Sequence, residues 1–474
     1  MAEFYHSVTL NEEKCVGCTN CIKRCPTEAI RVRGGKAVIA SERCIDCGEC
    51  IRICPHHAKR ARHSHLSQLS DFTYTIALPA PSLYGQFNNL DDIDYVLTGL
   101  KEMGFDDVFE VSRAAELVSE ATRKLMDAGA LKRPVISSAC PAVVRLIRVR
   151  FPDLCDHVLP LKSPMETAAA MAKRDAVKKT GLPPQQIGCF FLTPCPAKVT
   201  DIEMPLGIEK SQVDGAIAIS EVFPELSHKM DHLEKVEPLA NSGVIGVGWS
   251  TSGGEAAALL NEKYLAADGI ENVIRVLEEI EDERIGDLDF IELNACSGGC
   301  VGGVLCVENP YVAKARIQRL RKYLPVSQNH LKGGPIPNVM EWEEPLEFSD
   351  VLTLSSNLKE AMEMMLQIDE IEKEFPGLDC GACGAPTCRA FAEDVVKGIC
   401  KDTECIFVYR NRMKKVASTL SELEESMGRF SREEAKEEKE EKKKWYVLRT
   451  VMYRTLKRST LPRCGIWLRS ARCC

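Results

Sequence analysis

Residues 187–198 read Ile-Gly-Cys-Phe-Phe-Leu-Thr-Pro-Cys-Pro-Ala-Lys, an apolar run typical of a strand that ends at Cys195 and Lys198. Three other short apolar runs end at chemically active loops in the same way: 75–78 before Pro79-Ala80-Pro81-Ser82, 134–136 before Ser137-Ser138-Ala139-Cys140-Pro141, and 289–293 before Asn294-Ala295-Cys296-Ser297-Gly298-Gly299-Cys300. A helix is expected over 167–179, because Ser163-Pro164-Met165-Glu166 combines a capping box with proline at the first helical position. Alternating strands and helices predict an α/β fold with a mainly parallel sheet, whose ligands bind beyond the carboxyl ends of the strands. Four cysteines reach that edge and could hold a buried cluster: Cys140, Cys195, Cys296 and Cys300.

Two cysteine runs of equal spacing occupy residues 1–60. The run Cys15-Val-Gly-Cys18-Thr-Asn-Cys21-Ile-Lys-Arg-Cys25-Pro26 is repeated from Cys44 to Pro55. In such runs three thiolates hold one cubane and the fourth ligates the other one. The spacing therefore predicts a small α+β ferredoxin-type domain with two 4Fe–4S clusters, one on Cys15, Cys18, Cys21 and Cys54 and one on Cys44, Cys47, Cys50 and Cys25. A zinc finger does not match, because no paired-histidine motif accompanies the cysteines.

A third cysteine group lies in residues 357–410, where a small helical domain is expected. Cys380, Cys383, Cys388 and Cys405 resemble the four-cysteine 4Fe–4S domain of corrinoid iron–sulfur proteins and ion-pumping reductases. Cys400 competes with Cys405 for the fourth position, and zinc is the alternative metal. Residues 411–445 predict a charged helix with a short a/d seam, so a coiled-coil homodimer or packing on its own domain is expected. The basic tail 446–474 has no predicted structure or role.

Composition narrows the class of protein. The chain has 474 residues, 23 of them cysteine, and a formal charge of −8, which does not favour nucleic-acid binding. No apolar stretch approaches the roughly 18 residues of a membrane span. No secretory signal opens the sequence, so a cytoplasmic location is expected. Clustered cysteines in that compartment indicate metal or redox chemistry more often than disulfides.

The central region, residues 70–350, resembles the iron-only (FeFe) hydrogenases. Its three cysteine loops follow that family's signature segments in order, T-S-C-C-P-x-W, M-P-C-x-x-K and E-x-M-A-C-x-x-G-C-x-x-G-G-G. The resemblance implies an H-cluster, which is a 4Fe–4S cubane plus a di-iron subsite with carbon monoxide, cyanide and azadithiolate. It implies Cys140, Cys195, Cys296 and Cys300 as cubane ligands, with Cys300 bridging to the subsite. It also implies that Lys198 and the Pro81-Ser82 loop contact the two cyanides, and that Thr193 and Asn294 replace two packing methionines.

The proton path of that family is not preserved here. Where the family has two adjacent cysteines, this chain has Ala139-Cys140, and the missing thiol is the one that exchanges protons with the subsite. Glu120 matches the first glutamate of the family path, whereas Arg123 and Leu159 replace its second glutamate and its serine. This pattern resembles the sensory branch of the family, where the same cysteine is replaced.

Three functions follow from these residues. The first is a low-turnover hydrogen sensor that interconverts H₂ with protons and electrons and passes electrons through three 4Fe–4S clusters to a ferredoxin or a signalling protein. The second is an ordinary ferredoxin-linked hydrogenase, an oxidoreductase acting on hydrogen. The third is an electron carrier or cluster-assembly scaffold without the di-iron subsite. Lys198 and the complete set of four cysteines argue against the third.

Overall fold

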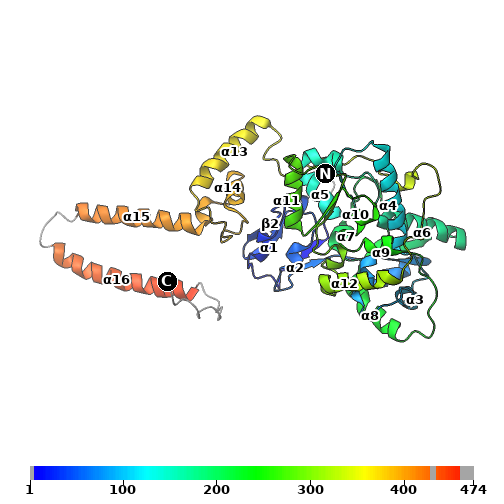
Figure 1. The fold of residues 1–474 in the computed structure, drawn as a ribbon. Helices are drawn as coiled ribbons and strands as arrows, with labels where there is room; N and C mark the ends of the chain where they lie inside the picture. The colour runs from blue at the N-terminus through cyan, green and yellow to red at the C-terminus, as the bar shows by residue number, and fades with distance from the viewer. Residues whose placement is uncertain (1–4, 428–433, 460–474) are drawn as a thin grey trace. The chain divides into compact units, whose positions relative to one another are not determined.

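The computed structural model describes residues 5–427 and 434–459 and divides into two compact units, residues 1–402 and 403–474 (Figure 1). The boundary at 402/403 falls inside the region 357–410, for which the cysteine spacing predicts one domain. The division into five domains stays a prediction.

Two parallel sheets form the centre of the first unit. One has the order β6 (Asp107–Val108), β5 (Tyr74–Pro79), β8 (Ile187–Thr193) and β9 (Gly215–Ala218), and the other β10 (Tyr264–Asp268), β11 (Phe290–Asn294) and β7 (Val135–Ile136). Every neighbouring pair in both sheets is parallel, which confirms the predicted α/β class. The four predicted apolar runs fall in β5, β7, β8 and β11. β5 and β8 belong to the four-stranded sheet, whereas β7 and β11 belong to the three-stranded one, where the short β7 pairs with β11 through Val135 and Ile136.

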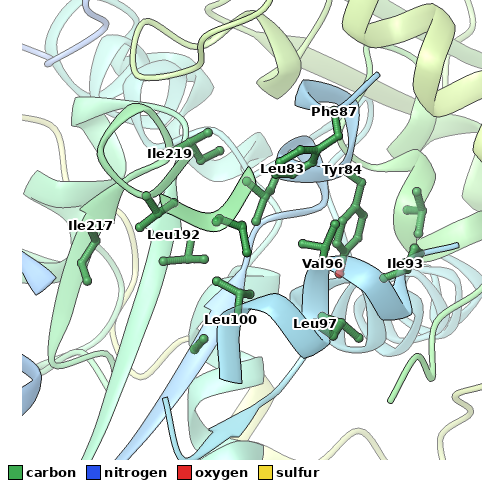
Figure 2. Packing of buried hydrophobic residues seen from close by; sticks show 14 of the residues in the cluster. Leu83, Tyr84, Phe87, Ile93, Val96, Leu97, Leu100, Leu192, Ile217 and Ile219 are labelled. Carbon is green, nitrogen blue, oxygen red and sulfur yellow. The ribbon is translucent and has the colours of Figure 1, made fainter. Parts of the chain in front are cut away.

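Both faces of the four-stranded sheet are covered. Successive side chains of a strand point to opposite faces, so Phe190 and Leu192 of β8 join one core cluster, while Cys189 and Phe191 join another. The first cluster contains η3 (Pro81–Gln86), α3 (Asp94–Glu102), α8 (Ile219–Asp231) and α12 (Pro310–Leu320), and part of it is seen in Figure 2. The second contains α6 (Pro164–Thr180). The other helices of the central region are α4 (Val111–Ala128), α5 (Pro141–Arg150), α7 (Pro196–Glu203), α9 (Val244–Gly248), α10 (Gly254–Ala258) and α11 (Ile270–Glu281).

The predicted capping box at α6 forms only in part. Ser163 Oγ accepts the Glu166 backbone N–H at 3.4 Å, and Pro164 is the first helical residue, as the sequence predicts. The Glu166 carboxylate instead accepts hydrogen bonds from Ser211 Oγ and from the Gln212 N–H. A tertiary contact has therefore replaced the second bond of the box.

The N-terminal and C-terminal cysteine groups lie among short strands and helices. β1 (Val8–Leu10) pairs with β4 (Lys59–Ala61) and β2 (Ile30–Arg33) with β3 (Lys36–Ile39), both antiparallel, with α1 (Asn20–Lys23) and α2 (Glu49–Arg52) between them in the sequence. This arrangement is the α+β pattern expected for a ferredoxin-type domain. In the first unit α13 (Leu358–Lys373) and α14 (Cys388–Val396) form the helical region.

The second unit contains α15 (Ile406–Met427) and α16 (Glu434–Ser459), which cover the described part of the predicted helix 411–445. α16 continues into the predicted basic tail, whose residues 460–474 lie outside the described residues, as do residues 428–433 of the predicted charged helix. Among the described helices, none is both long and apolar enough to cross a membrane.

Candidate functional site

The four central cysteines sit at the ends of β-strands, next to helix starts. Cys140 and Cys195 are the N-caps of α5 and α7, and Cys296 and Cys300 lie in the loop after β11. The pKa of the Cys195 thiol is raised to about 11 and that of Cys300 to about 12. Burial is the main cause, the Lys198 ammonium lowers both values, and the neighbouring cysteines add to the rise. Thiols that repel one another as thiolates need a cation between them to deprotonate together. This set therefore fits an iron–sulfur cluster.

Lys198 places an ammonium beside these thiols. It is 8% exposed, and its Nζ donates to the Ala139 carbonyl at 3.1 Å. Burial lowers the pKa of Lys198, but the negative charges of Cys300 and Cys195 outweigh that effect, so the net shift is upward. The side chain is thus held charged, and it can donate to an anionic ligand.

A cavity opens between Lys198 and the loop after β5. Its wall contains these predicted site residues: Pro81, Ser82, Ala139, Lys198, Asn294 and Cys300. Ser82 is completely buried, and its Oγ has no hydrogen-bond partner among the described residues. A buried hydroxyl without a partner is costly, so this atom fits a polar ligand in the cavity. Thr193 has another position, since its Oγ1 donates to the Cys195 carbonyl at 2.9 Å and thereby holds the cysteine loop.

Two buried glutamates that the sequence analysis missed line the same cavity, Glu255 of α10 and Glu292 of β11. Ser137 Oγ donates to Glu255 at 2.6 Å, and the Gly253 and Ala256 N–H groups donate to Glu292 at 2.9 Å. Burial raises the pKa of both carboxyls, and the charge of Glu292 raises that of Glu255 further. The pair can therefore hold a proton near neutral pH.

A signal for one of these glutamates was present in the sequence. Glu292 occupies the glutamate position of the E-x-M-A-C pattern, as Glu292-Leu293-Asn294-Ala295-Cys296. Asn294 Nδ2 also donates to the Glu292 carboxylate at 2.7 Å. Glu255 follows two glycines and has no comparable motif, so it could be found only from the fold.

The predicted relay residue Glu120 lies elsewhere on α4. Its carboxylate accepts the Leu331 N–H at 3.0 Å and is 3.4 Å from Lys124 Nζ. It is not among the residues that line the cavity. Arg123 donates to the Ala258 carbonyl, and Leu159 is buried in an apolar cluster. The role of Glu120 in proton transfer stays a prediction.

The structure places the N-terminal cysteines near one another, and their assignment to two clusters stays a prediction. Cys15, Cys18, Cys21 and Cys54 line one cavity. Burial raises the pKa values of Cys44, Cys47 and Cys50, and the charge of Cys25 raises the last two further. Cys47 packs against the same apolar cluster as Cys140 and Cys195. The second predicted cluster site and the central cysteines therefore border the same apolar cluster.

The C-terminal cysteine loop of the first unit contacts the ferredoxin-type hairpin β2–β3. The Val32 N–H donates to the Gly384 carbonyl at 2.8 Å, and Arg33 donates to the Cys383 carbonyl at 2.9 Å. Asp394 of α14 is 2.8 Å from Arg31 and also pairs with Arg33. Cys400 belongs to the first unit and Cys405 to the second, so the choice between them as fourth ligand stays a prediction.

Comparison with known families matches three segments of the chain. Residues 73–264 and 255–304 match the iron only hydrogenase large subunit, C-terminal domain. Residues 7–55 match a 4Fe-4S dicluster domain, and residues 375–407 match an Fe-S cluster family. These matches cover all three predicted cysteine groups.

Individual relatives are distant. The chain is 23% identical to iron hydrogenase 1 of Clostridium pasteurianum over 371 residues, which is 63% of this chain and 64% of that protein. It therefore spans less than two thirds of that relative. It is 31% identical to the cytosolic Fe-S cluster assembly factor nar1 of Emericella nidulans over 97 residues, 19% of this chain and 16% of that one. A solved FeFe-hydrogenase from Chlamydomonas reinhardtii aligns with a TM-score of 0.41 and 18% identity over 53% of this chain and 84% of that chain.

Proposed function

Because this chain belongs to the iron-only hydrogenase large-subunit family, we propose that it is a cytoplasmic hydrogen sensor with low turnover. The observation that carries this proposal is Ala139. Its methyl group lines the cavity beside Lys198, at the position where the active family has a proton-exchanging thiol. Proton transfer needs a titratable group within hydrogen-bond reach, and a methyl group cannot serve.

The central residues would divide the work as follows. Cys140, Cys195, Cys296 and Cys300 would hold the cubane of an H-cluster, and its di-iron subsite would supply an open iron where hydrogen binds and is split. Lys198 and Ser82 would donate hydrogen bonds to anionic ligands in the cavity. A charge-assisted bond from a buried ammonium is about twice as strong as a neutral one.

Protons would leave through groups that differ from the predicted Glu120. Glu255 and Glu292 face the cavity, and Ser137 joins Glu255 to the Ala139 N–H, which donates to Ser137 Oγ at 3.1 Å. A carboxyl whose pKa is raised toward neutral pH can both take up and release a proton, but the Ala139 methyl group beside the cavity cannot pass it on. This exit supports a slow exchange of protons without stopping it.

Electrons would pass from the central cluster to the cluster on Cys25, Cys44, Cys47 and Cys50, and then onward. Contacts of β2–β3 with the Cys383 loop supply a route to the C-terminal cluster. A ferredoxin or a signalling protein would take up the electron there.

The main alternative is a cluster-assembly or electron-transfer protein without the di-iron subsite. The similarity to nar1 over 97 residues favours it. Against it stand Lys198 and Ser82, because a charged ammonium and an unpartnered buried hydroxyl line one cavity beside the four cysteines and fit polar ligands there in addition to a cubane. The ordinary ferredoxin-linked hydrogenase is the other alternative, and Ala139 argues against it.

One experiment separates the three functions. The full chain is matured anaerobically with the di-iron subsite, and infrared spectra are recorded together with hydrogen evolution from a reduced dye. The sensor proposal expects carbon monoxide and cyanide bands, hydrogen-dependent reduction of the clusters, and very slow evolution. Absent bands would favour the scaffold, and rapid evolution would restore the ordinary hydrogenase.

A further inference from the structure

Lys59 of β4 is a buried cation without a visible partner. Its side chain is 3% exposed, and Nζ has no hydrogen-bond partner among the described residues. It lines the cavity that is formed by the four predicted ligands of the first N-terminal cluster, Cys15, Cys18, Cys21 and Cys54. An unpaired buried ammonium costs several kcal/mol, so an anionic group is expected in this cavity.

The internal repeat of the domain makes this lysine conspicuous. The two runs continue as Cys25-Pro-Thr-Glu-Ala-Ile30 and Cys54-Pro-His-His-Ala-Lys59. Ile30 therefore occupies the position equivalent to Lys59, and it is 2% exposed. The backbone repeats as well, since the Ala29 N–H donates to Cys25 Sγ at 3.2 Å and the Ala58 N–H to Cys54 Sγ at 3.3 Å. One half of the repeat thus has a core residue where the other half has a charge.

The charge of Lys59 acts on the predicted ligands. It lowers the pKa of Cys21, a predicted ligand of the first cluster, and also that of Cys50, a predicted ligand of the second, although burial, the larger effect, raises both. At Cys54, burial raises the pKa, but backbone N–H groups of Lys59, Ala58 and His56 together with the ammonium outweigh it, so the net shift is downward. Another ammonium of the same domain, Lys36, is bonded to the Glu12 and Cys15 carbonyls.

We propose that Lys59 sets the reduction potential of the first N-terminal cluster, by donating N–H groups to its sulfur atoms and by stabilising its reduced state. Hydrogen bonds to sulfur and nearby charge are the protein's means of tuning such clusters. Reduction adds one electron, and hence one negative charge, to a cluster that Lys59 faces. The electron comes from hydrogen or from an added reductant.

This inference rests on the proposed iron–sulfur function and deepens it. A cluster of raised potential would collect the electrons that hydrogen delivers. Its equivalent on Cys25, Cys44, Cys47 and Cys50 has Ile30 in place of the lysine at the corresponding position of the repeat. The two N-terminal clusters would then have different potentials, and the first would store the signal.

The test is a redox titration of the full chain with dithionite, followed by electron paramagnetic resonance. Lys59→Met should decrease the equilibrium constant for reduction of the first cluster at least about tenfold, which is 59 mV for one electron. Lys59→Arg, which keeps charge and donors, should retain most of the wild-type value. Arg60→Met is the matched control, because this neighbouring side chain is exposed and its charge is screened.

Iron and sulfide contents show whether each variant has assembled its clusters. If Lys59→Met does not assemble them, Lys59→Gln keeps N–H donors without the charge and should give an intermediate decrease. An equal potential in wild type and in the assembled neutral variant would overturn the inference. The titration needs no di-iron subsite. The effect of Lys59 on the cluster potential can therefore be measured even if the protein does not sense hydrogen.

Discussion

At position 139 this chain has alanine where the active family has a cysteine that exchanges protons. Ala139→Cys should increase dye-driven hydrogen evolution, because each relay group in acid–base catalysis contributes typically about 10²–10⁴-fold. The recovery should be partial, since protons would still have to leave through Glu255 and Glu292 and not through the family's path, which Leu159 and Arg123 interrupt. Ala139→Ser is the matched control, because a hydroxyl of similar size does not titrate near neutral pH. Equal rates for the cysteine variant and the wild type would contradict the proposed role of position 139.

Glu255 gives a second test at the scale of one residue. Glu255→Gln cannot exchange a proton and should lower the remaining hydrogen evolution by about 10²–10⁴-fold. Burial and the charge of Glu292 raise the pKa of Glu255. Its protonated form therefore adds stability that is present below the ordinary carboxyl pKa and is lost as the pH rises through the raised value. The infrared absorption of protonated carboxyls should fade on raising the pH in wild type, and the part of it that belongs to Glu255 should be missing from the difference spectrum of the variant.

Glu120→Gln is the comparison for Glu255→Gln. Glu120 is outside the cavity lining and is hydrogen-bonded to the Leu331 N–H, so its replacement should change turnover little. If Glu120→Gln lowers the rate of hydrogen evolution more than Glu255→Gln does, Glu120 is the proton relay, as predicted from the sequence.

The cysteines and the glutamates differ in how far sequence could predict them. Thiolate spacing reflects the short loops that wrap a cubane, so the cysteine groups can be read from local sequence. Glu255 reaches Glu292 only because α10 packs against β11, a contact that no spacing encodes. A single buried carboxylate in a sequence looks like any other acidic residue.

At the scale of elements, strand positions were predictable but strand pairing was not. The apolar runs before Cys140 and Cys195 are β7 and β8, yet β7 joins β11 in a separate sheet. β7 has only two residues, so its sequence does not indicate which strand it pairs with, and tertiary packing determines the pairing. The same reason explains α6, where Glu166 binds Ser211 and Gln212 rather than completing its capping box.

The contact of α14 with β2–β3 depends on one buried carboxylate. The Asp394 side chain is 7% exposed and pairs with Arg31 and Arg33. Asp394→Ala should destabilise this contact by about 3–5 kcal/mol, because it leaves two partly buried arginines without their partner. Faster amide hydrogen exchange in residues 30–39 would measure the loss.

Arg389→Ala on the same helix is the matched control for Asp394→Ala. Arg389 is 53% exposed and pairs with Asp369 and Glu372, and such surface pairs contribute about 0–1 kcal/mol. Amide hydrogen exchange of residues 30–39 in the Arg389→Ala variant should resemble that of the wild type. Equal effects of the two variants would show that the buried pair does not hold the contact.

For the whole molecule, the cysteine groups predict the iron content. Four cubanes and a di-iron subsite require about 18 iron atoms per chain. Iron analysis of the anaerobically matured protein should give this number, and Cys296→Ala should lower it by about six, because the central cubane and its subsite are lost together. A wild-type content of about eight would leave only the ferredoxin-type domain with clusters.

The predicted homodimer would form through α15, which shows an apolar stripe. Met413, Val416 and Leu420 follow the a/d spacing of a coiled coil and are 52%, 53% and 54% exposed. Removing residues 411–474 should therefore leave the iron content unchanged and reduce a dimer to a monomer, as measured by light scattering after gel filtration.

A point variant separates the stripe from the rest of the deleted segment. Leu420→Lys should also yield the monomer, because an ammonium in the seam is buried without a partner when two helices pair. Thr419→Lys introduces the same charge at the neighbouring exposed position and should leave the dimer intact. If the number of chains per particle stays the same after truncation and after Leu420→Lys, the stripe does not join two chains. The signal from hydrogen must then leave a single chain through its clusters.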